Sequence, residues 1–572
     1  MDIKELQTTD MWDLYQKSVN FMHLRKIYED TDLNYRMYNG DQWNGLKVKG
    51  IEKVQFNFIK LIVKQKVSNI TANLFAINYS PENIENQEFV DMAQKTCDLL
   101  NRKASTVFDK DFMDKKVKKW TRQAAINDEA ICYVDYDSDT DLPINEIISK
   151  NDIMYGNENE DEIQFQPYIL IRQRKPVSEL RELARDLELD EEKVGSIVGD
   201  NDTSTASGDS AKDELEDKCW LLTMFYRAKD GNIHWSQSTK YCELKKDKDL
   251  GIRLYPIAHF NWEDQEGNAR GVGEVRQLIP NQIETNKTAM RRAETVKSTA
   301  YPQKVMDVTS VENPEEANRI GGVIKFRNMG GAKADDVFTN TRPAQMSPDS
   351  SALQGELINL TRELNNANDA ATGSIDPSTA SGKAILAVQN AQNLPLNDQV
   401  MGLKSFLEDI ARIWFAMWKT YAGDGLKVDI VERDITTGQE LRRQEKVPKT
   451  VLEALETSVK VDITPKGAFD KYAQELSLEN LFTSGNITFE EYVNSLDTDS
   501  VMPKVKLQQI VKDRQEAQAR IQAINMEAEA IKGQLQAQNA SEMDIENQMA
   551  NQRITASTFD GIEQAFDRVS PA

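Results

Sequence analysis

The sequence predicts a helix-rich α+β protein with several domains. Long segments place apolar residues three and four positions apart, as amphipathic helices do, and shorter segments alternate apolar and polar residues, as half-buried strands do. The chain has 572 residues, enough for more than one domain and a sizeable core. Because 39% of its residues are apolar and 28% are charged, the composition is that of a globular protein rather than a disordered one.

The C-terminal half holds the clearest helices. Residues 349–372 have leucines on one face, and residues 383–422 form a longer apolar pattern that contains Pro395. Proline removes a backbone donor and clashes with the preceding turn, so we expect a helix kink near residues 390–394. Between these helices, residues 373–382 are rich in Gly, Ser and Thr and predict a mobile loop. An earlier helix, residues 274–297, carries one apolar stripe: Val275, Leu278, Ile279, Ile283, Ala289, Met290, Ala293 and Val296.

Strands and shorter helices are expected on either side of these helices. Asp230 and Gly231 separate two apolar runs and predict a β-hairpin, and Thr488 and Glu491 predict a capping box that opens a short helix. We further expect strands at residues 130–135, 166–172, 219–227, 232–238 and 323–326, helices at 12–28, 57–67, 89–105, 114–127, 176–187 and 469–481, and strands at 426–431 and 459–463 that pair with each other.

The order helix, small mixed domain, helix, loop, kinked helix resembles the portal proteins of tailed bacteriophages. Thr372 with Gly373, and the run from Ser381 to Ala384, fit the loop of that family. The aromatic turn segment at residues 35–43 and the helix led by Asn57 resemble the N-terminal part of many portals. The resemblance implies these domains: 1–273, an α+β wing; 274–297, a stem helix; 298–346, a clip; 347–372, a second stem helix; 373–382, a tunnel loop; 383–470, a kinked wing helix with return strands; 471–572, a helical crown and C-terminal tail.

The resemblance implies a structural protein rather than an enzyme, with no cofactor. It implies a ring of twelve copies at one capsid vertex of a virion, assembled in the host cytoplasm, through which double-stranded DNA is packaged and ejected. The implied partners are other copies of the chain, the terminase large subunit, a head-completion or adaptor protein, and the major capsid or scaffolding protein. The implied DNA-channel loop residues are Gly373, Ser374, Ile375, Asp376, Pro377, Ser378, Thr379, Ser381, Gly382 and Lys383.

Four basic residues lie beside the apolar stripe of the first stem helix: Lys287, Arg291, Arg292 and Lys297. They can form intersubunit ion pairs with Glu356 and Glu363 of the other stem helix, or they can line a channel where weak, exchangeable phosphate contacts permit sliding. We favour the first interpretation.

Charge and cysteine usage narrow the function classes. A net charge of −23 is not that of a protein that grips DNA over its whole surface, because neutralising phosphates requires lysine and arginine. The four cysteines form no CxxC pair, so we expect reduced, buried thiols and assembly in a reducing compartment. No signal peptide and no run of 18 apolar residues is visible, so we expect no membrane association.

Little in the sequence supports catalysis. The chain has three histidines, and two of them lie in or near predicted strands, where a structural role is expected. Ser381 to Ala384 has neither the glycine spacing nor the Ser or Thr of a nucleotide-binding P-loop. The acidic run Asp135, Asp137, Asp139, Asp141 and Glu146 has the spacing of a calcium loop, but Thr140 stands where glycine is required. We interpret this run as a solvated acidic turn. A third function class, a nuclease or other metal enzyme, has only this run to support it.

A second function class remains open. Residues 504–549 repeat apolar residues at a spacing close to 3.5, which predicts a helix on a core or a coiled-coil-like seam between copies. An acidic coiled-coil scaffold or adaptor protein of a virion would explain this segment but not the order of helices before it.

Overall fold

The structure is a computed structural model that describes residues 10–43, 53–82, 87–200, 217–300, 304–319, 321–327, 330–331, 333–340, 349–364, 394–433, 440–465 and 478–495, with residues 507, 510, 511, 514 and 520. It divides into two compact units, Met1–Thr464 and Pro465–Ala572. The predicted tunnel loop at 373–382, most of the predicted helix at 469–481 and nearly all of the predicted helix at 504–549 lie outside the described residues.

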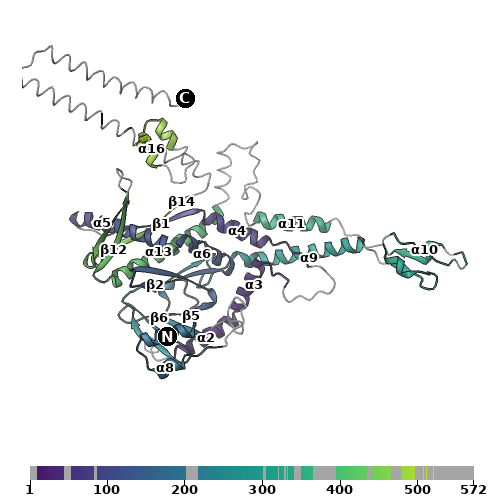
Figure 1. Ribbon diagram of the computed structural model, residues 1–572, viewed down its shortest axis with the longest axis horizontal. Coiled ribbons are helices and arrows are strands. Elements are labelled where there is room, and N and C mark those ends of the chain that lie inside the picture. Colours follow the sequence, from purple (N-terminus) through teal and green to yellow (C-terminus); the bar gives the residue numbers. More distant parts are fainter. Residues whose placement is uncertain are drawn as a thin grey trace, which may run out of the picture. The chain divides into compact units, whose positions relative to one another are not determined.

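A five-stranded antiparallel sheet lies in the first unit, with the strand order β4-β5-β6-β7-β8. Its strands β5 and β6 are labelled in Figure 1. Strand β6 is buried along most of its length, so both of its faces need cover. Leu222, Met224 and Tyr226 pack against helix α2 (Met11–Leu24), while Phe225 faces the residues of a second sheet. The strands are β4 (Ile153–Tyr155), β5 (Tyr168–Pro176), β6 (Lys218–Arg227), β7 (Ile233–Ser238) and β8 (Glu243–Asp249).

The second sheet has the order β3-β2-β9 and is formed by β2 (Glu129–Asp137), β3 (Leu142–Ile148) and β9 (Ile257–Asn261). Helices pack on it and form the largest hydrophobic core among the described residues, in which Trp120, Trp414 and Trp418 are fully buried. Helix α13 contributes the apolar face that its sequence predicts, and its Phe406 meets Trp120 edge to face. The helices of this core are α4 (Phe58–Ile70), α5 (Gln87–Lys110), α6 (Met113–Asn127) and α13 (Asn397–Tyr421).

The predicted pairing of residues 426–431 with 459–463 is wrong. Strand β12 (Gly425–Arg433) pairs with β13 (Glu440–Pro448), and β14 (Thr457–Pro465) forms its own two-stranded sheet with β1 (Asn73–Pro81). Both predicted segments carry the same alternation of Val, Asp and Ile, and such a pattern defines a strand without defining its neighbour.

The predicted helix at 12–28 is two helices, α2 (Met11–Leu24) and α3 (Ile27–Asn39), because Lys26 adopts a left-handed conformation with φ 59°. Gly40 ends α3 with φ 94°, as the Asn-Gly turn predicts. The remaining short elements of the body are η1 (Lys150–Asp152), η2 (Ile163–Phe165), α7 (Val177–Asp186), α8 (Glu191–Ser196) and α14 (Lys449–Ala454).

Helix α9 (Glu274–Ala300) leads to a small subdomain, from which α11 (Asp349–Leu364) returns beside α9 (Figure 1). The subdomain pairs β10 (Lys304–Met306) with β11 (Phe338–Asn340) and also contains η4 (Pro314–Asn318) and α10 (Ala334–Val337). The strand predicted at 323–326 is absent from the described residues; Phe326 makes only an isolated bridge to Val311.

Pro395 lies in a short 3-10 turn, η5 (Leu394–Leu396), directly before α13. Within the described residues, proline therefore stands at the start of this helix rather than in its interior, where its missing donor costs little. Residues 383–393 are outside the described residues.

In the second unit, helix α16 (Phe489–Ser495) packs Tyr492 and Val493 into a small apolar cluster. The predicted capping box is confirmed: Thr488 N donates to Glu491 Oε2 at 2.8 Å, and Glu491 N donates to Thr488 Oγ1 at 3.3 Å.

Candidate functional site

The candidate functional site is the stem, which we define as helices α9 and α11. Asn281 Nδ2 donates to Thr361 Oγ1 at 3.1 Å, and Arg292 Nη1 donates to Gln354 Oε1 at 2.5 Å. Residue numbers rise along α9 as they fall along α11, so the helices are antiparallel. Thr361 and Gln354 are buried, and the seam between the helices is therefore partly polar.

The N-terminal half of α9 is fixed through Gln282 to the body, by which we mean the two large sheets and the helices packed on them. The side chain of Gln282 is fully buried. Its Oε1 accepts hydrogen bonds from Phe58 N at 3.1 Å and Ile59 N at 3.4 Å, and its Nε2 donates to Phe56 O at 2.5 Å. Phe58 and Ile59 are the first residues of α4, where backbone donors lack partners within the helix. One glutamine thus satisfies the beginning of α4 from a neighbouring helix.

One turn further along α9, Asn286 continues this contact. Its Oδ1 accepts from Phe56 N at 3.2 Å, and its Nδ2 donates to Gln42 Oε1 at 2.5 Å. Asn57 caps α4 by accepting from Lys60 N at 3.1 Å, and its Nδ2 donates to Tyr38 O at 2.9 Å. The aromatic turn segment and the helix led by Asn57, which the sequence singled out, therefore bind the stem helix.

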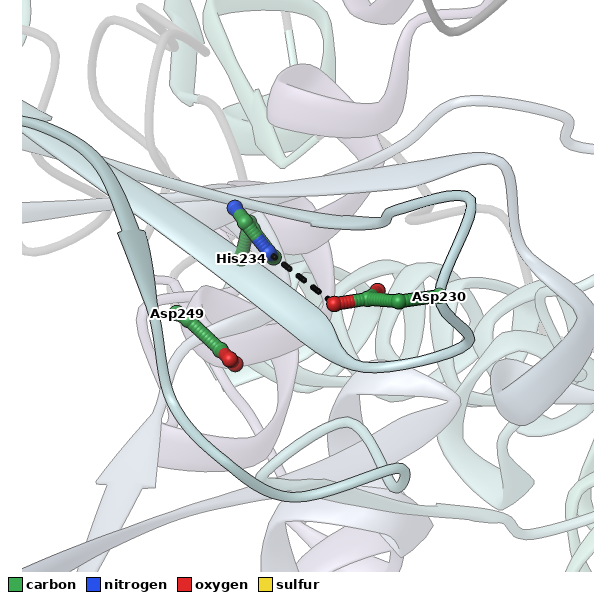
Figure 2. Close-up of side chains that lie close together, drawn as sticks. All are labelled: Asp230, His234 and Asp249. Carbon is green, nitrogen blue, oxygen red and sulfur yellow. Dashed lines mark ion pairs between the residues drawn. The ribbon is translucent and has the colours of Figure 1, made fainter.

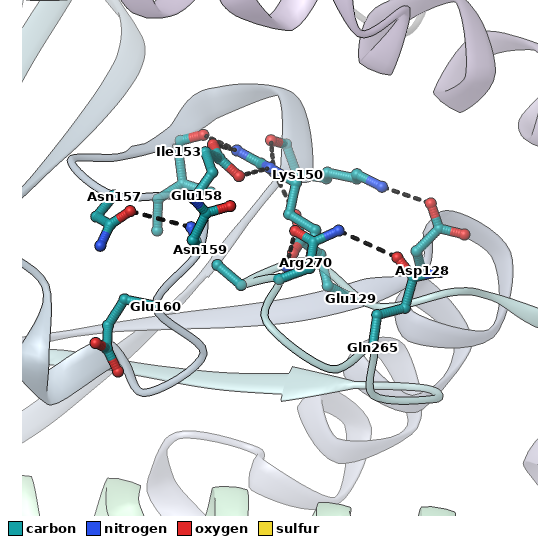
Figure 3. A network of polar contacts seen from close by, with 12 residues as sticks. Asp128, Glu129, Lys150, Ile153, Asn157, Glu158, Asn159, Glu160, Gln265 and Arg270 are labelled. Carbon is teal, nitrogen blue, oxygen red and sulfur yellow. Dashed lines mark hydrogen bonds and ion pairs between the residues drawn. The ribbon is translucent and has the colours of Figure 1, made fainter.

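A buried polar network lies where the body meets α9 (Figure 3). Arg270 is its centre: Nη1 lies 2.6 Å from Glu129 Oε1, and Nε lies 2.9 Å from Glu158 Oε2. Arg270 Nη2 also donates to Ile153 O at 3.2 Å. Glu129 is fully buried and has a second partner in His259, whose Nε2 lies 3.0 Å from Glu129 Oε2.

These neighbours keep Glu129 ionised although it is buried. Burial alone would raise the pKa of this carboxyl, but the charge of Arg270, the hydrogen bond with His259 and the charge of Lys150 outweigh it and lower the pKa to about 2. The carboxylates in turn raise the pKa of the Arg270 guanidinium. The network is thus a set of fixed, compensated charges.

The same network reaches the first residues of α9. Asp128 Oδ1 accepts from Gly273 N at 2.7 Å, and its Oδ2 lies 2.5 Å from Lys150 Nζ. Glu274 opens α9; its Oε1 lies 2.7 Å from Lys66 Nζ, and its Oε2 accepts from Trp262 Nε1 at 3.2 Å. A negative side chain at a helix N-terminus is favoured by the helix dipole. The direction in which α9 leaves the body is therefore set by buried groups.

The predicted stem basic residues are all on α9 but have different partners. Lys287 and Arg291 both approach Glu284 of their own helix, at 3.8 and 3.7 Å, while Arg292 contacts Gln354 of α11. Lys297 lies in the last turn of the helix. Intersubunit ion pairs with Glu356 and Glu363 remain a prediction.

The apolar stripe of α9 is buried beside the body and at Ala289, but not along its whole length. Val275 and Leu278 pack in the main core, whereas Ile283 and Val296 are exposed by 37% and 67%. Leu360 and Leu364 of α11 are exposed by 54% and 78%. The stem thus presents apolar side chains that nothing in the described part of this chain covers.

The acidic run at 135–146 occupies a β-hairpin rather than the loop between two helices of a helix–loop–helix calcium site. It lies in the tight hairpin between β2 and β3, where Asp137 pairs with Leu142 and accepts hydrogen bonds from Asp139 N and Thr140 Oγ1. Glu146 accepts from Gln173 Nε2 at 2.6 Å. Among the described residues, the group that brings three metal-binding side chains together is instead Asp230, His234 and Asp249.

The expected placement of two histidines in or near strands and the expected burial of the cysteines are confirmed. His234 and His259 lie in strands β7 and β9, and all four cysteines are buried and free. Each helix in the described part of the chain is too short or too polar to cross a lipid bilayer. The sequence analysis did not identify Gln282, Asn286, Arg270 and Glu129. The spacing of apolar residues does not distinguish a polar residue that is buried from one that is exposed.

The arrangement of α9, the small subdomain and α11 agrees with a comparison of this chain with protein families. The model of the phage P22-like portal protein family matches residues 183–564, about two thirds of the chain and the whole of the stem. A search of curated proteins found no match. The matched range includes the helix–subdomain–helix order that a coiled-coil scaffold or adaptor would not explain. This chain, a mixed helix and strand protein with a paired stem, therefore belongs to the phage P22-like portal protein family.

Proposed function

We propose that copies of this chain close into a ring, of twelve copies by the family resemblance, whose stems surround a channel for double-stranded DNA. The observation that carries the proposal is the α9–α11 pair, which is firmly fixed at its base and presents the exposed apolar residues Ile283, Val296, Leu360 and Leu364. A closed ring gives every copy the same two contacts, so modest interfaces add up to a stable assembly.

In this proposal each domain has its own function. Residues 1–273 and 383–470 form the wing, 274–297 and 347–372 the stem, 298–346 the clip, and 471–572 the crown and tail. DNA enters as the terminase large subunit drives packaging at the clip, and a head-completion or adaptor protein later takes the place of the terminase. The wing faces the major capsid or scaffolding protein at one vertex of the virion, and DNA leaves by the same route on ejection.

The predicted tunnel loop, residues 373–382, would contact the moving DNA. It contains Asp376 as its one charged residue, with Lys383 directly after it. A duplex that must slide needs contacts without a strong phosphate trap, and the net charge of −23 serves the same requirement. The chain then acts as a structural conduit and carries out no covalent chemistry.

Negative-stain electron microscopy and light scattering of the purified protein test ring formation. We expect annular particles with a central opening and a mass that is a whole multiple of 65.0 kDa. Monomers or open chains at every concentration would contradict the ring.

Removal of residues 504–572 separates the portal from the scaffold alternative. A ring held by stem and wing contacts should persist without this segment, whereas an adaptor held together by a coiled-coil tail should fall to monomers. A third experiment tests the channel: shortening residues 374–379 should leave rings intact but reduce DNA packaging in a phage that depends on this protein. The control His23→Gln changes an exposed residue outside the loop and should package normally.

A further inference from the structure

A histidine and two aspartates meet at one end of the five-stranded sheet (Figure 2). His234 on β7 and Asp249 at the end of β8 are directly opposite each other in the strand register. Side chains of directly opposed residues lie on the same face of a sheet. Asp230 is in the turn between β6 and β7, four residues before His234.

Asp247 orients the imidazole ring. His234 Nδ1 lies 2.7 Å from Asp247 Oδ1, and the same carboxylate oxygen accepts a hydrogen bond from the hydroxyl of Tyr226. Asp247 adopts a left-handed conformation with φ 43° at an irregularity in the β7–β8 register, and its N–H donates to Ser236 Oγ at 3.0 Å. A carboxylate on one imidazole nitrogen fixes the proton there and leaves the lone pair of the other nitrogen available, as in many metal sites.

The other nitrogen, Nε2, is the reason to look for a ligand. It is buried and has no hydrogen-bond partner in the structure, although the carboxylates of Asp230 and Asp249 lie close to the imidazole. Asp230 Oδ2 lies 3.9 Å from it, which is beyond hydrogen-bond distance. One atom from each of His234, Asp230 and Asp249 lies within 4.8 Å of the other two.

Both carboxylates are positioned by hydrogen bonds from amide groups. Asp230 Oδ1 accepts from Asn232 N at 3.0 Å, and Asp249 accepts from Asn232 Nδ2 at 3.1 Å and from Gly251 N at 2.7 Å. Within the described part of the chain, His234 is the one basic side chain that forms an ion pair with Asp230, and Asp249 forms none. Three carboxylates around one imidazole leave a negative charge that a cation would neutralise.

We propose that His234 Nε2, Asp230 and Asp249 bind a divalent transition-metal ion, and that Zn²⁺ is the ion this donor set suits. Zinc takes imidazole and carboxylate ligands, commonly three from the protein with water in the fourth place. Calcium prefers six to eight oxygen ligands and suits an imidazole poorly. Tetrahedral zinc places its ligand atoms about 3.3 Å apart, so the two exposed aspartates need to close by a short side-chain rotation.

The bound ion would link the β6–β7 turn to the end of strand β8, which is an edge strand of its sheet. Edge strands lack a partner on one side and depend on additional contacts. The ion would thus fasten this edge of the proposed wing. This inference does not depend on ring formation or on DNA passage.

Titration of the full-length, EDTA-treated protein with ZnCl₂, followed by calorimetry, tests the site. We expect one high-affinity equivalent per chain. His234→Gln and Asp249→Asn should each weaken binding at least tenfold, and Asp230→Asn, in the exposed turn, should weaken it without altering the fold. His23→Gln is the matched control, because His23 is exposed and lies elsewhere on the body; it should bind as the unaltered protein does.

Cobalt absorption spectroscopy identifies the ligands independently. Co²⁺ bound at this site should give bands of a nitrogen and oxygen environment that are lost in His234→Gln. A thiolate charge-transfer band would place the metal at a cysteine, and equal zinc affinity in His234→Gln, or no binding by the unaltered protein, would overturn the proposal. Zinc should also raise the melting temperature of the unaltered protein and of His23→Gln, but not that of Asp249→Asn.

Discussion

Arg270 and Glu129 form a buried ion pair, with 2.6 Å between Nη1 and Oε1, directly before the helix that forms the first half of the stem. Both side chains are almost fully buried, so neither charge can be compensated by water if its partner is lost. The pair therefore decides both the stability of the body and the position of α9.

Replacing Arg270 with Ala should destabilise the body by about 3–5 kcal/mol, because Glu129 would keep its charge in a buried site with fewer partners. The shift of the urea unfolding midpoint, followed by tryptophan fluorescence, measures the effect. Arg327→Ala is the control: Arg327 pairs with Glu312 at 2.7 Å on the exposed surface, and its loss should leave the midpoint unchanged. Equal shifts in the two variants would contradict the assigned role.

The same network predicts how stability depends on pH. The pKa of Glu129 is lowered from its ordinary value of 4.5 to about 2 in the folded protein. A lowered carboxyl pKa stabilises the fold above the unfolded value, and this stabilisation is lost as pH falls from about 4.5 towards 2. Glu129→Gln should therefore melt well below the unaltered protein at pH 6, and the difference should shrink as pH approaches 2. A difference that stays constant across this range would argue against the charged state of Glu129.

Two glycines, Gly273 directly before α9 and Gly355 within α11, should respond to replacement by alanine with opposite changes in stability. A Cβ on Gly273 would lie 2.8 Å from Asp128 N and 3.1 Å from Ala125 O, and backbone atoms cannot move aside easily. Gly273→Ala should lower the melting temperature and disturb the start of α9. A Cβ on Gly355, within α11, would meet nothing within 4 Å, so Gly355→Ala should stabilise the helix by about 0.5–1 kcal/mol. Calorimetric melting of both variants checks the pair.

Gln282→Leu should cost about 1–3 kcal/mol for each backbone group of Phe56 and Phe58 that loses its partner while buried. The volume of the side chain is nearly kept, so the loss reports on hydrogen bonding rather than on a cavity. Gln277→Leu is the control on the same helix, since Gln277 is exposed and donates only to Glu263 at 3.2 Å. Hydrogen exchange of the first turn of α4 should increase in Gln282→Leu alone.

The double variant Leu360→Asp and Leu364→Asp tests the proposed interface between copies. Both residues are exposed in the single chain, so the body should melt at an unchanged temperature. If the stem packs against a neighbouring copy, buried carboxylates there should prevent ring formation in electron micrographs. Leu24→Asp, at a site exposed by 81% on α2, should leave rings intact. Rings of normal yield from the double variant would remove this face from the interface.

The sequence predicted the elements better than their contacts. Helices α9 and α11, the β6–β7 hairpin and the α16 capping box follow from periodicity and turn chemistry, and α13 lies within the longer helix predicted at residues 383–422. The strand partners of β12 and β14 did not, because an alternating pattern carries no information on which strand lies beside it. The interruption between α2 and α3 at Lys26 was not predicted, because no glycine or proline lies there.

The sequence also did not predict which residues fix α9 to the body. In the sequence, Gln282 and Asn286 are typical of solvent-exposed positions on a helix. They are buried and accept hydrogen bonds because the backbone of Phe56 and Phe58, from a distant segment, packs against them. Arg270 and Glu129 are 141 residues apart. The stem basic residues were placed correctly on one helix, but their partners depend on rotamers and neighbours that spacing does not record.

The sheet formed by β1 and β14 has a consequence for how the chain is made. Residues 73–81 find their sheet partner only at residues 457–465, so 376 positions (457 − 81) separate the end of one strand from the start of the other. At about 5–20 residues per second, a ribosome needs roughly 20–75 seconds to reach the second strand after finishing the first. Throughout that time the earlier segment has no sheet partner within its own chain, and its edge is open to pairing with the identical segment of a neighbouring nascent chain on the same message.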